Sequence, residues 1–178
     1  GLIFGDGTAL ASMGSNTAGF YDDDVGGTVE MFGIVEAGVT SQLTGLAIRK
    51  TADESVTNST MHQADDHLTV QLAASSAYFF EIHGHWTTAG ATACISVQLD
   101  GTVGVSSLKA DVTIFDHTTN AMSALDRVTA FNATVGSGLT GDNSFLIRGT
   151  IETSTAGTLF LEWAQNSADL VNATTLQE

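Results

Sequence analysis

Alternation of apolar and polar side chains with a period of two residues is the feature that most constrains the fold of this chain. It is clearest over residues 77–87, where one set of alternate positions is apolar and the other carries Glu81, His83 and His85. Because successive side chains of a β-strand point to opposite faces, this pattern predicts a strand that is buried on one face. The apolar set consists of Tyr78, Phe80, Ile82, Gly84 and Trp86.

Similar short segments recur along the chain, for example at 92–100, 144–153 and 157–165, and turn residues separate them. The Gly-bearing loops at 88–91 and 154–157 each predict a hairpin between the flanking strands. The chain has no proline, and Lys, Arg and Glu, which commonly cover exposed helices, are scarce. These features predict an all-β fold: an antiparallel, jelly-roll-like β-sandwich of about eight to ten strands.

The first part of the chain differs from the rest. Glycines interrupt any period over residues 1–27, and apolar anchors lie among them at Leu2, Ile3, Phe4, Phe20 and Tyr21. A long structureless stretch is uncommon inside a compact domain. We therefore expect an irregular N-terminal arm over residues 1–27 that gains structure on another surface, followed by the β-sandwich domain over residues 28–178.

The charge balance excludes several classes of partner. The chain carries a formal net charge of −15 and only five Lys and Arg residues. Nucleic acids and anionic membranes are bound through clustered basic side chains, so neither is an expected partner. A single cysteine, Cys94, also rules out an intrachain disulfide framework.

The sequence predicts no metal site, no cofactor and no catalytic residues. In a strand, Glu81, His83 and His85 would project from one face, as metal ligands do. A cupin would need a further Glu or His nearby, and its usual prolines and glycines at fixed offsets are absent, so we expect this face to meet solvent or a neighbouring subunit. The acidic runs at 22–24, 53–54 and 65–66 match no calcium-loop spacing. No nucleophile can be assigned either, because the chain lacks the G-x-S-x-G elbow. The protein is therefore not expected to be an enzyme.

Several strands carry apolar side chains on both faces. Phe79, Phe131 and Phe160 lie opposite the inward positions of their strands. Exposed apolar patches of this kind mark subunit contacts, and most soluble oligomers are closed and symmetric. We expect an oligomer interface that includes Phe79, His83, His85 and Phe160.

Three stretches of the chain, taken together, resemble a domain that recurs in structural proteins of tailed bacteriophages. The resemblance covers about residues 46 to 178. It is carried by KTADESVT at 50–57, DDHLTV at 65–70 leading to YFFE at 78–81, and GTIE at 149–152 continuing through GTL at 157–159 to WAQN at 163–166. The pattern of the family continues with a further strand, so we expect residues beyond Glu178 to be missing from this sequence.

The resemblance implies a virion part, typically a trimeric β-sandwich with no catalytic residues to transfer. Two roles fit it. The first is a capsid decoration (cement) protein, a homotrimer on the outer surface of the capsid that binds the major capsid protein through Leu2, Ile3, Phe4, Phe20 and Tyr21. The alternative is the distal knob of a tail or head fibre that binds a host receptor. The short chain, the absence of a fibrous shaft and the arm favour the first role.

Overall fold

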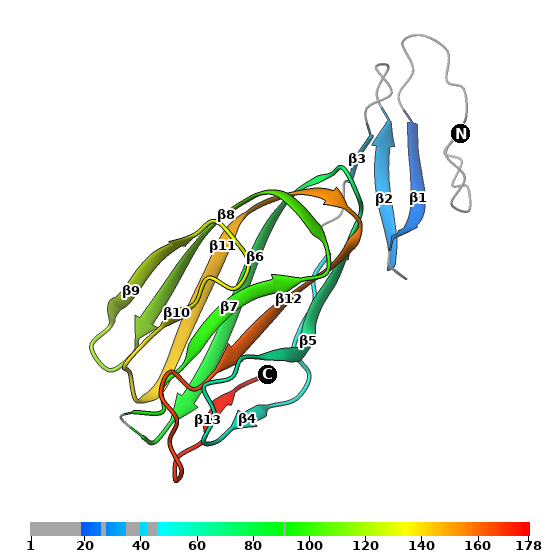
Figure 1. The fold of residues 1–178 in the computed structure, drawn as a ribbon. Helices are drawn as coiled ribbons and strands as arrows, with labels where there is room; N and C mark the ends of the chain where they lie inside the picture. The colour runs from blue at the N-terminus through cyan, green and yellow to red at the C-terminus, as the bar shows by residue number, and fades with distance from the viewer. Residues whose placement is uncertain (1–18, 26–27, 35–39, 43–45, 91) are drawn as a thin grey trace. The chain divides into compact units, whose positions relative to one another are not determined.

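The computed structural model describes residues 19–25, 28–34, 40–42, 46–90 and 92–178. The chain divides into two compact units, Gly1–Ala47 and Ile48–Glu178. In the first unit, β1 (Gly19–Val25), β2 (Thr28–Ile34) and β3 (Thr40–Gln42) form a three-stranded antiparallel sheet in the order β1-β2-β3 (Figure 1).

This division differs from the boundary predicted at residue 27. Residues 28–34 were expected to open the sandwich, but they pair with residues 19–25 of the expected arm. Only Gly26 and Gly27 separate the two strands, and a glycine pair is a strong hairpin signal. The boundary predicted at residue 27 therefore separates two strands that pair with each other. Residues 1–18 of the expected arm lie outside the described residues.

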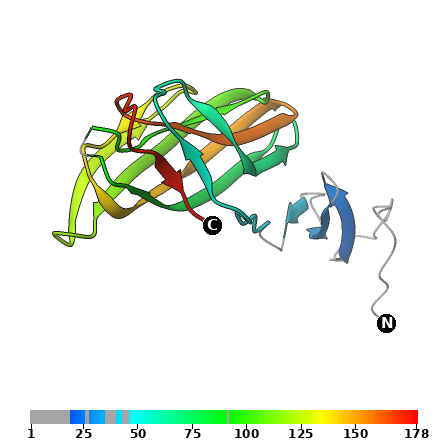
Figure 2. The ribbon, with the colours of Figure 1, turned by 90° about the horizontal axis from the view of Figure 1, so that it is seen from below.

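The second unit is an antiparallel β-sandwich whose strands lie in two layers (Figures 1 and 2). The four-stranded sheet has the order β10-β7-β12-β5, and the six-stranded sheet has the order β4-β13-β6-β11-β8-β9. The strands are β4 (Glu54–Val56), β5 (Gln63–Leu72), β6 (Ala77–Thr88), β7 (Ser96–Gly101), β8 (Gly104–Asp116), β9 (Ala121–Val128), β10 (Val135–Gly136), β11 (Gly141–Thr155), β12 (Gly157–Ala164) and β13 (Thr174–Leu176).

The strand order is that of a jelly roll. From β5 to β12, every connection crosses from one sheet to the other except the one between β8 and β9. This leaves β5-β12-β7-β10 facing β6-β11-β8-β9, with β13 and β4 added beside β6. The predicted all-β sandwich is thus confirmed. Among the described residues, no helix is long and apolar enough to cross a membrane.

One hydrophobic core lies between the two sheets. Trp86 and Phe145 enter it from the six-stranded sheet, and Leu161 and Trp163 enter it from the four-stranded sheet. All four are at most 1% exposed. The residues of β6 and β11 that were predicted to point inward do face this core. Alternation of side chains is a property of the strand itself and does not depend on which sheet the strand joins.

Both predicted hairpins are wrong. Strands β6 and β7 lie in different sheets, and so do β11 and β12, although only Ala156 separates the latter pair. The pairing of β11 with β8 is irregular around Thr153, and β12 then pairs with β5 and β7. Bulges and bends of this kind let a strand change sheets at the corner of a sandwich. A short glycine-bearing loop therefore does not distinguish a hairpin from a crossing.

Strands β8 and β11 approach each other closely at Gly149. A Cβ atom added there would lie 2.6 Å from Ala110 Cα and even closer to the carbonyl oxygen of Lys109. Gly149→Ala should therefore force the two strands apart and lower the free energy of unfolding by about 1–3 kcal/mol, as overpacking does. Urea unfolding followed by fluorescence of the buried tryptophans would measure the change.

Gly138→Ala is the matched control, because nothing lies within 4 Å of a Cβ atom at that position. Its free energy of unfolding should stay within about 0.5 kcal/mol of the parent value. Equal stability of the two variants would contradict the close approach of β8 and β11.

Candidate functional site

The outer face of the six-stranded sheet carries an exposed apolar patch. Strand register places Phe115 beside Met122, and Leu146 in line with Thr113 and Leu125, so these side chains are neighbours on one face. Met122 is 56% exposed and Leu125 is 62% exposed. We call Phe115, Met122, Leu125 and the partly buried Leu146 the apolar patch.

The predicted interface residues divide between the two sheets. Phe79, His83 and His85 lie on the outer face of β6, and register puts His83 and His85 in the same cross-strand rows as the apolar patch. Phe79 is 67% exposed and lies at the other end of β6. Phe160 is partly buried and lies on the outer face of the four-stranded sheet, so a single surface cannot contain all four.

The histidines on β6 interact with different partners. His83 Nε2 lies 2.8 Å from Glu81 Oε1, whereas the His85 ring packs against the His117 ring in a T-shaped arrangement with a centroid distance of 5.9 Å. Glu81, His83 and His85 therefore do not converge on a common point, as a metal would require. Of the expected capsid contacts, Phe20 and Tyr21 fall in β1, and Leu2, Ile3 and Phe4 lie outside the described residues.

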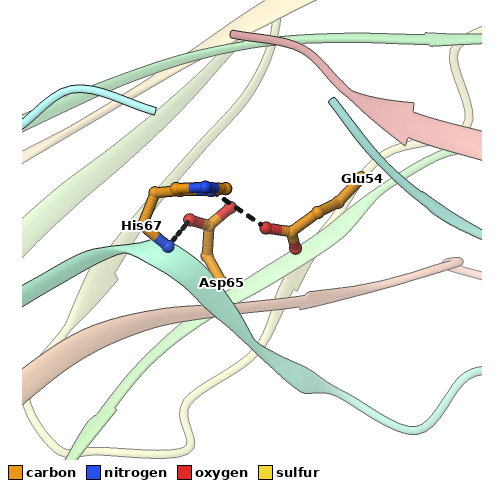
Figure 3. Close-up of side chains that lie close together, drawn as sticks. All are labelled: Glu54, Asp65 and His67. Atoms are coloured by element: carbon orange, nitrogen blue, oxygen red, sulfur yellow. Dashed lines mark hydrogen bonds and ion pairs between the residues drawn. The ribbon is translucent and has the colours of Figure 1, made fainter. Parts of the chain in front are cut away.

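A second cluster, which the sequence analysis missed, brings β4 and β5 together. Figure 3 shows Glu54 pointing toward Asp65 and His67. Lys50 completes it: its Nζ lies 2.7 Å from Glu54 Oε1 and 2.7 Å from Asp65 Oδ2. Lys50 is 4% exposed and the Asp65 side chain 0%. We call Lys50, Glu54, Asp65 and His67 the lysine cluster. It connects two edge strands, because β4 and β5 each end the order of their sheet.

The backbone of β5 supplies further donors to the lysine cluster. Asp65 Oδ1 accepts the amide N–H groups of His67 and Leu68 at 2.9 and 2.8 Å. Glu54 Oε1 accepts the amide of Asp66 at 3.2 Å and lies 3.3 Å from His67 Nδ1. The two oxygens of Asp65 thus have separate roles: Oδ1 is held by amides and Oδ2 faces the Lys50 ammonium.

Electrostatics in the lysine cluster favour a charged lysine. Burial lowers the pKa of Lys50, but hydrogen bonds to Asp65 and Glu54 and their negative charges outweigh burial, so the pKa is raised. A buried charge without partners would be very costly, and this one is compensated by two carboxylates.

A metal ion does not fit the lysine cluster as the chain builds it. Glu54, Asp65 and His67 are the described residues whose ligand atoms come within 4.8 Å of one another. The Lys50 ammonium already lies between the two carboxylates, and a divalent cation there would have to displace it. The sequence signal for this cluster is faint: acidic pairs stand at 53–54 and 65–66, but nothing in the sequence connects Lys50 to them.

Comparisons with known proteins add little. No family model matches the chain, and no curated protein matches it. One solved structure to which the fold shows a weak similarity is a carbohydrate-binding module of the β-sandwich superfamily. It has 9% sequence identity, a TM-score of 0.19, and coverage of 90% of this chain and 73% of that one. A TM-score this low carries no argument about the ligand.

The contrast between buried and exposed ion pairs gives a direct test of the lysine cluster. Lys50→Met leaves two carboxylates without their cation and should lower the free energy of unfolding by about 3–5 kcal/mol. Arg127→Met is the control: its pair with Asp111 is 2.9 Å long, but the two side chains are 72% and 52% exposed. Arg127→Met should lower the free energy of unfolding by less than about 1 kcal/mol. Denaturant titration of both variants would measure the difference, and equal losses would mean that the lysine cluster is solvated.

Proposed function

We propose that this protein is a structural component of a bacteriophage virion: a homotrimeric capsid decoration protein that binds the major capsid protein on the outer surface of the shell and stabilises it. The observation that carries the proposal is the outer face of the six-stranded sheet, where the apolar patch and Phe79 are exposed. Large exposed apolar surface on a soluble domain marks an interaction site. In this proposal the chain is not an enzyme.

Self-association would cover the exposed side chains. The apolar patch is bordered by the charged row Glu81, Arg148, Asp111 and Arg127, which alternates in sign across four adjacent strands. An apolar centre with a polar rim is the usual anatomy of a protein–protein interface. Alternating signs also suit contact with a neighbouring copy, since each charge can face its opposite.

The charge of the chain supports a place outside the shell. A protomer with a net charge of −15 is repelled by packaged DNA and attracted to neither nucleic acid nor anionic lipid. Many such acidic copies on the outer surface would also make whole particles repel one another in solution.

The division into two units supports separate roles along the chain. The sandwich, Ile48–Glu178, coincides closely with the part that resembles phage structural domains, and Gly1–Ala47 is a unit of its own. In the proposed role the N-terminal unit contacts the major capsid protein and the sandwich forms the trimer. Phe20 and Tyr21 remain proposed contacts because they lie in this unit, as do Leu2, Ile3 and Phe4.

The location of the protein on a particle tests the proposal. Cryo-electron microscopy of virions carrying the protein should show it over the whole head surface, in a fixed ratio to the major capsid protein. A few copies confined to the tail or a vertex would instead support the alternative, a fibre knob that binds a host receptor. Absence from the particle would reject both.

Removing the apolar patch should weaken self-association. Leu125→Asp places a charge in the centre of a contact that must be desolvated, so the trimer dissociation constant should rise at least about tenfold. Sedimentation equilibrium would measure it. Val171→Asp is the matched control, because Val171 is 86% exposed and lies in the loop before β13 rather than on the sheet face. Equal association of both variants and the parent would show that the patch is not the interface.

A further inference from the structure

We propose that the lysine cluster forms a covalent bond: an amide between Lys50 Nζ and Asp65 Cγ, made by the folded chain itself with Glu54 as the general base. The inference goes beyond the proposed function and does not depend on it. It rests on how the lysine cluster places an amine, a carboxyl group, a base and two amide donors together in a buried position.

The amine already touches the carboxylate group that it would attack. Lys50 Nζ lies 2.7 Å from Asp65 Oδ2, with Lys50 4% exposed and the Asp65 side chain 0%. Holding reactants in contact removes the entropy cost that makes amide formation slow in solution. Burial also matters because it limits the access of water, which otherwise favours the free acid and amine.

The amide donors are placed where negative charge would develop. Attack on Cγ turns the Asp65 carbonyl oxygen into an oxyanion, and Oδ1 accepts the N–H groups of His67 and Leu68. Two backbone donors on one oxygen form an oxyanion hole, which is commonly the largest single contribution to acyl transfer.

Glu54 is placed to move the protons. Its Oε1 lies 2.7 Å from Lys50 Nζ and within 4.8 Å of the Asp65 carboxylate. The carboxylate can therefore take a proton from the attacking nitrogen and return it to the leaving oxygen after a small movement. Positioned general bases of this kind accelerate reactions by about 10²–10⁴-fold.

The reaction balances without any oxidant or co-reactant. The Lys50 ammonium first passes one proton to Asp65 Oδ2, which leaves an amine beside a neutral carboxylic acid. The Nζ lone pair then forms a bond to Cγ, the C=O electron pair moves to Oδ1, and Glu54 removes a second proton from Nζ. The Oδ1 pair re-forms the carbonyl, the Cγ–Oδ2 bond breaks, and Glu54 protonates the departing hydroxyl. One water leaves, and Glu54 ends as it began.

The first proton transfer limits how much of the reactive, neutral pair is present. Because the carboxylates hold Lys50 in its charged form, the neutral pair is a minor state of the lysine cluster. We therefore expect slow maturation after folding rather than immediate reaction, and the test must follow the protein over time.

Intact mass spectrometry of the full chain tests the proposal directly. The purified protein, measured fresh and after prolonged incubation at 37 °C, should lose one water, about 18 Da. A mass that stays equal to the sequence mass throughout would overturn the proposal. An Asp-Gly succinimide, which Asp6-Gly7 or Asp100-Gly101 could form, also loses one water, so the bond must be located.

Peptide mapping locates the bond. Trypsin cannot cleave after an acylated Lys50, and its sites at Arg49 and Lys109 release one peptide that contains both partners. Further cleavage after Glu54 and Glu81 should leave peptide 50–54 joined to peptide 55–81. If these two peptides separate while the water loss persists elsewhere, the proposal is wrong.

Two conservative variants distinguish the reaction from a structural role. Lys50→Arg keeps the positive charge but offers no amine, and it should retain the full mass. Glu54→Gln keeps the size of the side chain but not the base, and its water loss should be at least about 100-fold slower. Water loss at the parent rate in Glu54→Gln would remove Glu54 from the mechanism, and linked peptides in Lys50→Arg would refute the bond to Lys50.

Discussion

The packing of two sheets around one apolar core is the constraint on which the rest of this structure depends. Nearly every connection from β5 to β12 crosses between the sheets, so neither sheet can form from a continuous part of the chain. Trp86 and Trp163 belong to different sheets and meet in the same core. Consequently, the outer surfaces are fixed by the inner ones: once Trp86 faces inward, His83 and His85 must face outward.

This dependence explains which parts of the fold could be predicted from the sequence. Alternation assigns each side chain to a face, and the inward positions of β6 and β11 were predicted correctly for that reason. Pairing partners depend on contacts distant in the sequence, and the loops after Thr88 and Thr155 look like hairpin loops although both cross between sheets. The N-terminal boundary failed similarly, because Gly26-Gly27 serves equally as a break or a turn in a sequence.

The two candidate sites were predictable to different degrees. The outer face of β6 follows from alternation alone, so Phe79, His83 and His85 were placed correctly on it, whereas Phe160 proved to lie on the other sheet. The lysine cluster could not be predicted, because Glu54 of β4 and Asp65 of β5 belong to edge strands of different sheets, and Lys50 contacts both carboxylates only in the folded sandwich. Its signals in the sequence are the acidic pairs at 53–54 and 65–66 and a lysine in a chain with only five Lys and Arg residues.

The position of β13 gives the lysine cluster a dependence on the order of synthesis. Strand β4, which begins with Glu54, pairs only with β13 among the described strands, and β13 in turn pairs with β6. Domains generally emerge from the ribosome N-terminal end first. Glu54 therefore stays without its sheet until residues 174–176 have been made, long after Lys50 and Asp65 have appeared. The strand that carries Glu54 thus gains its described pairing partner only when almost all of the sandwich exists.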